Sequence, residues 1–287
     1  MRRLFPVLLA ALALAACGKP SPRVMARFVP ERADDFAWEN ELVAYRAYGE
    51  ALETLDPGGT ISPGFDVWVK DTSTLVMDLR YKDELERGIS YHKYFHGAKD
   101  CYKVARSLGG GASSPLIGGK FACPPTNFRS FELLTGEYAS DSVAFVLRYP
   151  QWEAGGYTLS LDKKITVKPG TYFCTAEDTW TFAGPAETLV IAAGIVRHAV
   201  EKEFNGTDRF AIWEPASDTG AEPEDGRIGL ALIAPRADSV VVSRALGHSL
   251  CVKTVRSGEK FTYRFGSCWS KAGIKDSEAW FNLVKAQ

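Results

Sequence analysis

The sequence lacks the excess of positive charge that nucleic-acid-binding proteins carry. It has 34 lysines and arginines against 35 aspartates and glutamates, which gives a net charge of −1. Removal of a leader that contains Arg2 and Arg3 would lower this charge to −3. Binding to nucleic acid depends on a concentrated basic surface. We therefore expect no nucleic-acid partner.

The motifs of several common enzyme classes are also missing. There is no GxSxG sequence and no HExxH sequence, so neither a serine hydrolase nor a classical zinc protease is supported. The cysteines show no CxxC spacing of a structural zinc site. The three glycines at 109–111 are not followed by the Lys-Ser/Thr of a phosphate-binding loop. They predict backbone freedom or the close approach of a ligand.

Long hydrophobic runs are absent after the first 16 residues. Two arginines are followed by an apolar stretch at 4–16, which is too short to span a bilayer. The sequence LAAC at 14–17 resembles the lipobox of bacterial lipoproteins. We predict a signal peptide at 1–16, a lipid on Cys17 and a tether at 17–24, with a plain secretory signal as the alternative. Residue 19 is Lys rather than Asp, so we expect an anchor in the outer membrane of a Gram-negative cell envelope.

Five further cysteines occur, at Cys101, Cys123, Cys174, Cys251 and Cys268. An exported chain enters an oxidising compartment, where cysteines usually pair. We predict the bridges Cys101–Cys123 and Cys251–Cys268, which leaves Cys174 free in a strand. Other pairings stay open.

Apolar residues alternate with polar ones over much of the chain, which is the pattern of half-buried strands. Between 128 and 167 the alternating runs end in the turn sequences LTG, EAGG and KPG. Further strands are expected at 24–29, 42–48, 65–69, 172–182, 189–196, 227–233, 239–243, 250–255 and 261–265. This spacing predicts a single, mainly β domain over 25–287, a large antiparallel β-sandwich with few short helices.

Two helical stretches are expected, one at 75–86 and one at the C-terminus. Asp276 is placed to cap the second helix, and Trp280, Leu283 and Val284 would share its buried face. The segment at 30–40, PERADDFAWEN, is rich in charge and is expected to form a connector.

The residue types most typical of a functional site occur together at 88–111, in the sequence GISYHKYFHGAKDCYKVARSLGGG. Its imidazoles and phenols favour a lined cleft over an ordinary core segment. His92 is a candidate general acid or base, with Tyr91 or Tyr102 relaying a proton. Arg106 would hold a carboxylate through paired hydrogen bonds. The alternative is a polar core in which these groups only brace a loop.

A metal site is the less favoured interpretation of the same stretch. His92, His96 and Asp100 are each four residues apart, so on a helix they would share one face and could hold a divalent metal. Neighbouring glycines and aromatic residues disfavour a helix there. We therefore predict no metal and no other cofactor, and assign His96 and Asp100 to ligand binding.

Further candidate ligand-binding residues lie outside this stretch. Arg32, Asp35 and Trp38 belong to the charged connector, and Trp68 lies in an expected strand. Either tryptophan could stack on a sugar ring. His248 precedes a strand and could face the same cleft, although a structural role also suits it.

Three segments together resemble a bacterial family, domain-of-unknown-function family 4861. They are FVPERADDFAWENELVAYRAYG at 28–49, ISYHKYFHGAKDCYKVARSLGGG at 89–111 and GHSLCVKTVRSGEKFTYRFGSCWSKAG at 247–273. The resemblance implies an exported protein associated with the degradation of pectin and other uronic-acid polysaccharides. It also implies a strand pattern similar to the galactose-mutarotase-like super-sandwich.

These observations lead to one main hypothesis of function. We expect a periplasm-facing lipoprotein that acts on acidic oligosaccharides by proton transfer, as a lyase, isomerase or mutarotase. Removal of a proton next to a carboxylate requires neutralisation of the carboxylate charge, which is why an arginine beside a base is expected. The alternatives are a non-catalytic glycan-binding lipoprotein and a structural envelope protein.

Overall fold

The computed structural model describes residues 21–55, 60–217 and 222–287. The predicted signal peptide and Cys17 lie outside the described residues, as does the first part of the tether. Within the described ranges, no helix is long and apolar enough to cross a membrane.

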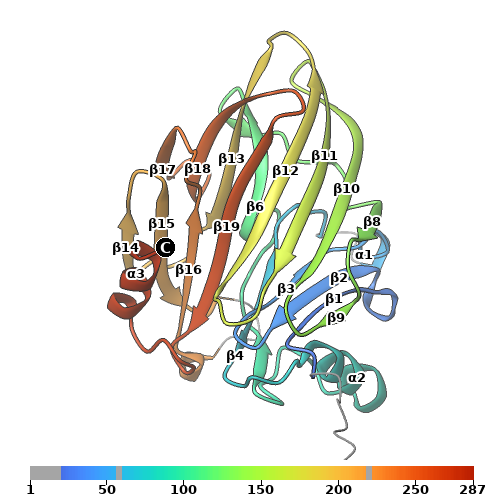
Figure 1. The fold of residues 1–287 in the computed structure, drawn as a ribbon, viewed down its shortest axis with the longest axis vertical. Helices are drawn as coiled ribbons and strands as arrows, with labels where there is room; N and C mark the ends of the chain where they lie inside the picture. The colour runs from blue at the N-terminus through green and yellow to red at the C-terminus, as the bar shows by residue number, and fades with distance from the viewer. Residues whose placement is uncertain (1–20, 56–59, 218–221) are drawn as a thin grey trace, which may run out of the picture.

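Three antiparallel sheets make up most of the molecule (Figure 1). The largest has eight strands in the order β14-β15-β16-β19-β12-β11-β10-β8. Their bounds are β8 Ser130–Leu133, β10 Val143–Ala154, β11 Tyr157–Val167, β12 Phe173–Ala183, β14 Lys202–Asn205, β15 Arg209–Pro215, β16 Arg227–Ile233 and β19 Lys260–Trp269.

The two smaller sheets have five and six strands. The five-stranded sheet runs β17-β18-β13-β6-β7, with β17 Ser239–Ser243, β18 His248–Arg256, β13 Thr188–Val196, β6 Gly110–Ile117 and β7 Lys120–Phe121. The six-stranded sheet runs β5-β4-β3-β2-β1-β9, with β5 Ala98–Asp100, β4 Asp66–Lys70, β3 Ala44–Ala47, β2 Asp35–Asn40, β1 Val24–Val29 and β9 Tyr138–Ala139. The helices are α1 Leu52–Leu55, α2 Met77–Arg87 and α3 Ser277–Lys285, with 3-10 turns at Pro30–Arg32 and Pro223–Asp225.

The smaller sheets form a second layer against the eight-stranded sheet (Figure 1). One large core, which contains Trp38, Ile191 and Phe265 among others, draws residues from all three sheets. A parallel bridge between Phe65 and Gly109 joins the two smaller sheets. The predicted mainly β, antiparallel sandwich with few helices is therefore confirmed.

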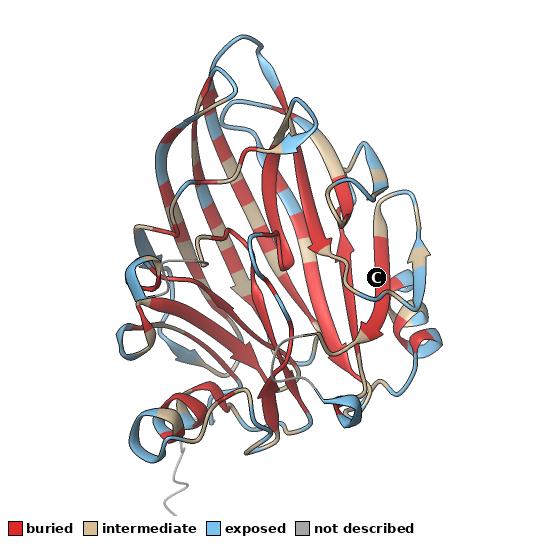
Figure 2. Cartoon of the chain, turned by 180° about the vertical axis from the view of Figure 1, so that it is seen from behind, coloured by how far each residue is buried: buried red, intermediate tan, exposed pale blue. Residues whose placement is uncertain are grey.

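Alternation along the strands decides which side chains enter this core. In β11, Tyr157, Leu159, Leu161, Ile165 and Val167 are buried while their neighbours are not, and the long strands appear striped in Figure 2. A strand presents successive side chains to opposite faces, so this pattern follows from the sequence.

The C-terminal helix α3 also forms as predicted. The side chain of Asp276 accepts a hydrogen bond from the backbone N–H of Ala279 at 2.9 Å, which caps the first turn. Trp280 and Val284 are fully buried, and Trp280 stacks on Phe173 with ring centroids 5.7 Å apart. Leu283 is half-buried at the edge of the same cluster.

The prediction of a connector at 30–40 is wrong for residues 35–40. Residues Asp35–Asn40 form β2, an interior strand of the six-stranded sheet, and all six are buried. The charged residues hide the strand pattern because their side chains pair inside the protein. Glu39, for example, accepts a hydrogen bond from Lys70 at 2.6 Å and another from the backbone N–H of Met77, the first residue of α2, at 2.8 Å.

The predicted disulfides are also wrong. Neither predicted bridge forms between the cysteines of the described residues, so only the expectation for Cys174 in β12 holds. Cys101 follows β5 of the six-stranded sheet, whereas Cys123 follows β7 of the five-stranded sheet. Cys251 and Cys268 lie in β18 and β19, which again belong to different sheets. Closeness in sequence is therefore no guide to closeness in space here.

Candidate functional site

The stretch at 88–111 divides between several elements rather than forming one loop. Gly88 ends α2 in the left-handed region, with φ 64°, and the chain then turns through 89–97 into β5. The glycine run lies where the two smaller sheets join. A Cβ on Gly109 would lie 2.4 Å from the carbonyl oxygen of Phe65. The glycines therefore allow close backbone packing within the fold.

The outward face of the six-stranded sheet carries an unusual concentration of buried charge. Arg46 in β3 is 3% exposed and lies among three aspartates. Its Nε is 2.6 Å from Asp66, its Nη2 is 2.8 Å from Asp100 and its Nη1 is 3.8 Å from Asp35. A buried charge is stable only when it is paired and hydrogen-bonded, and here one cation serves three carboxylates.

Aromatic side chains from α2 and the following turn cover this charge. The ring of Tyr91 lies 4.7 Å from the guanidinium carbon of Arg46 and stacks on Trp68 at 5.1 Å between centroids. Tyr81 packs edge-on against Tyr91 at 6.2 Å. Together with Met77 these rings form a small core separate from the main one. The charged face is thus sealed from water on most sides.

The predicted stacking role of the two tryptophans is wrong. Trp38 is fully buried in the main core, with its ring 5.1 Å from that of Phe65. Trp68 is 1% exposed beneath Tyr91. Neither ring offers a face to a ligand, because each lies inside a packed cluster.

The segment at 30–40 contacts the stretch at 88–111 through Arg32 and Tyr91. The Nε and Nη2 groups of Arg32 donate hydrogen bonds to the hydroxyl of Tyr91 at 3.0 and 2.9 Å. The Nη1 of Arg32 lies 3.5 Å from Asp35, which is longer than a normal hydrogen bond. Arg32, Asp35 and Tyr91 therefore lie together, although the sequence placed them in two separate segments.

A cavity of about 180 Å³ opens beside this arginine, and we call it the Arg32 pocket. Its lining consists of Glu31, Arg32, Tyr81, Glu84, Leu85 and Tyr91. The hydroxyl of Tyr81 is buried and has no hydrogen-bond partner among the described residues. A buried polar atom in this state indicates a place for water or a ligand.

Burial shapes the ionisation of the carboxyls around the pocket. It raises the pKa of Asp35 to about 6, although the guanidiniums of Arg46 and Arg32 oppose this shift. Burial also raises the pKa of Glu84, against the pull of Arg32 and Arg46. Burial acts to lower the pKa of Arg32, but Asp35 and Tyr91 outweigh it and raise that pKa. The pocket therefore retains a charged arginine.

His92 lies at the edge of the same cluster. Its side chain is 38% exposed, and its ring centroid is 4.7 Å from that of Tyr91. Its Nδ1 is 3.3 Å from the backbone carbonyl oxygen of Asp100 and 3.7 Å from the Oδ2 of the same residue. His92, Tyr91 and Asp100 therefore lie together, whereas Arg106, the predicted partner of His92 and Tyr91, is not part of the Arg32 pocket lining.

The two histidines of the stretch do not share one helix face. The Nε2 of His96 is 3.0 Å from Asp83 in α2, while His92 faces Asp100. His96 itself has a positive φ of 52° in a turn, which excludes a continuous helix. Across the described ranges, no group of three histidines, cysteines or acidic residues is arranged to hold a metal ion.

Three other predicted site residues lie elsewhere. Tyr102 is 1% exposed in the main core, where its hydroxyl donates to the carbonyl of Val196 at 3.2 Å. Arg106 is exposed on the loop between β5 and β6 and is not part of the Arg32 pocket lining. His248 is 3% exposed and accepts a hydrogen bond from the backbone of Leu108 at 3.2 Å. Its role is structural, and burial lowers its pKa.

Sequence reasoning missed Arg46, Tyr81 and Glu84. Arg46 carried a usable signal, because it is the one charged residue within the predicted strand at 42–48 and therefore needed a buried partner or an exposed face. Tyr81 and Glu84 are three residues apart on α2, so they point to the same side of the helix. No pattern in the sequence shows that this side faces Arg32.

Solved structures with a similar fold are distant. A "Putative kojibiose phosphorylase from human microbiome" is 10% identical with a TM-score of 0.40, over 92% of this chain and 36% of that one. The α-galactosidase AgaB of Geobacillus stearothermophilus is 9% identical with a TM-score of 0.36, over 86% of this chain and 41% of that one. This chain therefore spans about two fifths of each of those proteins.

One relative is closer in sequence. "Uncharacterized protein P7" of Formosa agariphila is 29% identical over 260 residues, which cover 86% of this chain and 62% of that protein. The chain thus spans less than two thirds of its relative's length. The sequence matches "Domain of unknown function (DUF4861)" over residues 17–287. This match covers nearly the whole chain, so the protein belongs to the DUF4861 family.

Proposed function

We propose that this protein binds uronic-acid oligosaccharides in the Arg32 pocket, with the carboxylate of one sugar against Arg32 and Tyr91. The observation that carries the proposal is a guanidinium held by a tyrosine hydroxyl at the wall of a cavity. Arg32 thus takes the part that the sequence assigned to Arg106.

The donors in the pocket favour an anionic oxygen. The hydroxyl of Tyr91 accepts two N–H groups from Arg32, so its own hydrogen is available to a ligand. The Nη1 group of Arg32 has only a long ion pair with Asp35 at 3.5 Å. Hydrogen bonds to a charged acceptor are the stronger kind, so a carboxylate gains most from this set.

The acidic residues of the pocket lining do not exclude an anionic ligand. Glu31 forms an ion pair with Arg27, which compensates its charge. The raised pKa of Glu84 favours its protonated form relative to an ordinary glutamate. The cavity of about 180 Å³ is below the roughly 300 Å³ at which pockets begin to enclose a drug-sized ligand. It therefore suits one sugar unit, with the rest of the chain outside.

The choice of a sugar acid rests on the sequence resemblance. The segments at 28–49 and 89–111, which carry that resemblance, also supply Glu31, Arg32 and Tyr91 to the pocket. An association with pectin and other uronic-acid polysaccharides gives the pocket a ligand with a carboxylate on every sugar.

Binding is tested by titration calorimetry with trigalacturonate and with its methyl ester. We expect the wild type to bind the acid at least about tenfold more tightly than the ester, because the ester lacks the charge. Arg32→Gln should weaken binding of the acid by a similar factor. Tyr91→Phe keeps the ring on Trp68 and should weaken it less.

The control is Arg148→Gln, which changes an exposed arginine of the eight-stranded sheet that pairs with Glu132. It should bind trigalacturonate as the wild type does. Equal affinity of the wild type for acid and ester would overturn the proposal. So would Arg32→Gln binding the acid as tightly as Arg148→Gln, or no binding by the wild type at millimolar acid.

A second candidate is turnover of the bound sugar, with His92 as the base, because its ring lies 4.7 Å from that of Tyr91, which lines the pocket. In a lyase reaction His92 would take the proton from the carbon next to the carboxylate, and the glycosidic C–O bond would break with its oxygen protonated by water. Absorbance of the unsaturated product measures this step. His92→Ala should abolish the signal while trigalacturonate still binds, and a wild type without any product would leave a binding protein.

We also propose that the protein is exported and anchored by a lipid on Cys17, facing the periplasm. The basic and apolar leader and the LAAC sequence at 14–17 support this. Growth of an expressing bacterium with labelled palmitate should label the wild type but not Cys17→Ser. A labelled Cys17→Ser protein would contradict the anchor.

A further inference from the structure

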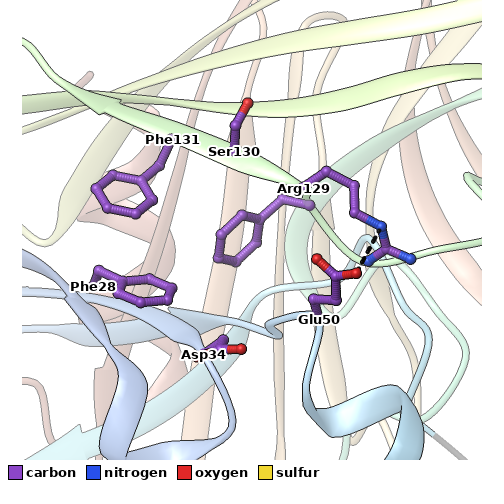
Figure 3. Close-up of a pocket in the computed structure, with 7 residues that line it drawn as sticks. Phe28, Asp34, Glu50, Arg129, Ser130 and Phe131 are labelled. Atoms are coloured by element: carbon purple, nitrogen blue, oxygen red, sulfur yellow. Dashed lines mark ion pairs between the residues drawn. The ribbon is translucent and has the colours of Figure 1, made fainter.

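A second pocket lies on the other side of the β1–β2 connection, and we call it the Phe pocket (Figure 3). Its volume is about 280 Å³, and its lining is Phe28, Asp34, Glu50, Phe128, Arg129, Ser130 and Phe131. Phe28 and Asp34 bracket the turn that supplies Glu31 and Arg32 to the Arg32 pocket. The two pockets therefore flank one short segment.

Three phenylalanines form the apolar side of the Phe pocket. Phe28 and Phe131 stack with ring centroids 4.9 Å apart, and Phe36 supports Phe131 from the core at 5.3 Å. Phe131 is 37% exposed, whereas Phe128 is buried. In Figure 3 the rings of Phe28 and Phe131 lie opposite Arg129 and Glu50, and Asp34 lies below Phe28. A ligand with one apolar and one polar side fits such a lining.

The backbone fixes the two carboxylates on the polar side. Ala33 and Asp34 have positive φ values of 52° and 61°, a costly conformation for residues other than glycine. Gly49 packs against this turn so closely that a Cβ would lie 1.9 Å from the carbonyl oxygen of Asp34. This contact brings Glu50 beside Asp34 at the rim. Backbone strain of this kind is often retained where it serves a binding site.

A buried asparagine supports the part of the Phe pocket that contains Arg129. Asn127 is fully buried, and its side chain donates to the carbonyl of Gly49 at 2.9 Å. Its backbone N–H donates to Glu53 at 2.7 Å, and Glu53 in turn binds Arg129 at 2.7 and 2.9 Å. Arg129 is therefore fixed in place, and Glu53 already compensates its charge. This part of the pocket is therefore preorganised for a ligand.

We propose that the Phe pocket is a binding site for a neutral saccharide. The C–H face of a sugar ring packs on Phe28 and Phe131, and its hydroxyls donate to Asp34 and Glu50. A sugar acid is disfavoured, because Asp34, Glu50 and Glu53 surround the single cation Arg129. This site is independent of the Arg32 pocket and takes a ligand of different charge.

The test is NMR saturation transfer and titration calorimetry with galactotriose and cellotriose. We expect at least one of them to bind the wild type, and Phe131→Ala to weaken that binding by at least about tenfold. Asp34→Asn removes the charge but keeps a residue type that tolerates positive φ, and should weaken binding about fivefold. Leu134→Ala, which changes another exposed apolar residue just after β8, is the matched control and should bind as the wild type does.

The outcomes separate this site from the first one. Arg32→Gln should bind the neutral saccharide as the wild type does, whether or not it loses trigalacturonate. The proposal is overturned if neither saccharide binds at millimolar concentration, or if Phe131→Ala and Asp34→Asn both bind as Leu134→Ala does. Competition of trigalacturonate for the neutral sugar would also overturn it, because the Phe pocket would then accept an acid. Thermal unfolding of each variant checks that it is folded.

Discussion

Replacement of Arg46 by methionine should destabilise the protein far more than loss of an exposed arginine. Arg46 is 3% exposed and is the shared partner of Asp66 at 2.6 Å and Asp100 at 2.8 Å, with Asp35 at 3.8 Å. Methionine fills similar space but leaves three buried carboxylates without this cation. Breaking a buried ion pair by removal of one partner costs about 3–5 kcal/mol, so we expect a loss in that range at pH 7. Arg148→Met removes an exposed pair and should cost under about 1 kcal/mol.

The cost of Arg46→Met should also depend on pH in a defined direction. Arg46 opposes the rise in the pKa of Asp35 that burial causes, so its removal should raise the pKa of Asp35 further in the folded state. Stability tied to a raised pKa is present at low pH and is lost as pH rises, so the variant should be worse at pH 8 than at pH 5. Urea unfolding of both variants at the two pH values measures this. A cost equal to that of Arg148→Met, or one that does not grow with pH, would refute the reasoning.

Three further predictions concern other parts of the molecule. Burial raises the pKa of Asp35 from 3.8 to about 6. The stability of the wild type relative to Asp35→Asn should therefore fall by up to about 3 kcal/mol as pH rises from 4 to 7, measured by urea unfolding. A stability difference that does not change with pH would contradict this. Asp276→Ala removes the cap of α3 and should cost about 1 kcal/mol in the same assay, whereas no loss would argue against the cap. Iodoacetamide added to denatured, unreduced protein should alkylate Cys123, Cys174, Cys251 and Cys268, since they are free, and a failure to label Cys251 and Cys268 would indicate a disulfide.

Much of the fold follows from local pattern alone. The alternation at 157–167 and the turn before it predict the β10–β11 hairpin, and the strands predicted at 24–29, 227–233 and 239–243 match β1, β16 and β17. The cap at Asp276 and the apolar spacing that follows it predict α3. These features depend on neighbours within a few residues, which sequence reasoning handles well.

The site could be predicted only in part, because its charges are paired over long distances in sequence. The segments at 30–40 and 88–100 were both identified as candidates, and the structure shows that they meet through Arg32 and Tyr91. The charges of 30–40 suggested a connector, yet Asp35 and Glu39 belong to a buried strand, and their partners Arg46 and Lys70 come from β3 and β4. Trp38 likewise gave no sign of its burial. Such pairing depends on strand order, which periodicity does not contain.

The helix at 75–86 was also predicted only in part, because its buried face is partly polar. It forms as α2, and Tyr81 is buried. Leu79 is 40% exposed although it is apolar, and the buried face instead includes Arg80 and Asp83. These polar residues bind the turn that follows: Arg80 donates to the carbonyls of Ser90 and Lys93 at 2.7 and 2.9 Å. The helix therefore packs on hydrogen-bonding groups that a hydrophobic pattern does not reveal.

The most direct test of the central claim is a crystal structure of the protein soaked with trigalacturonate. The account predicts a sugar carboxylate in the Arg32 pocket, about 3 Å from both the guanidinium of Arg32 and the hydroxyl of Tyr91. Trigalacturonate bound only at another place, or an Arg32 pocket without it at saturating concentration, would contradict the account.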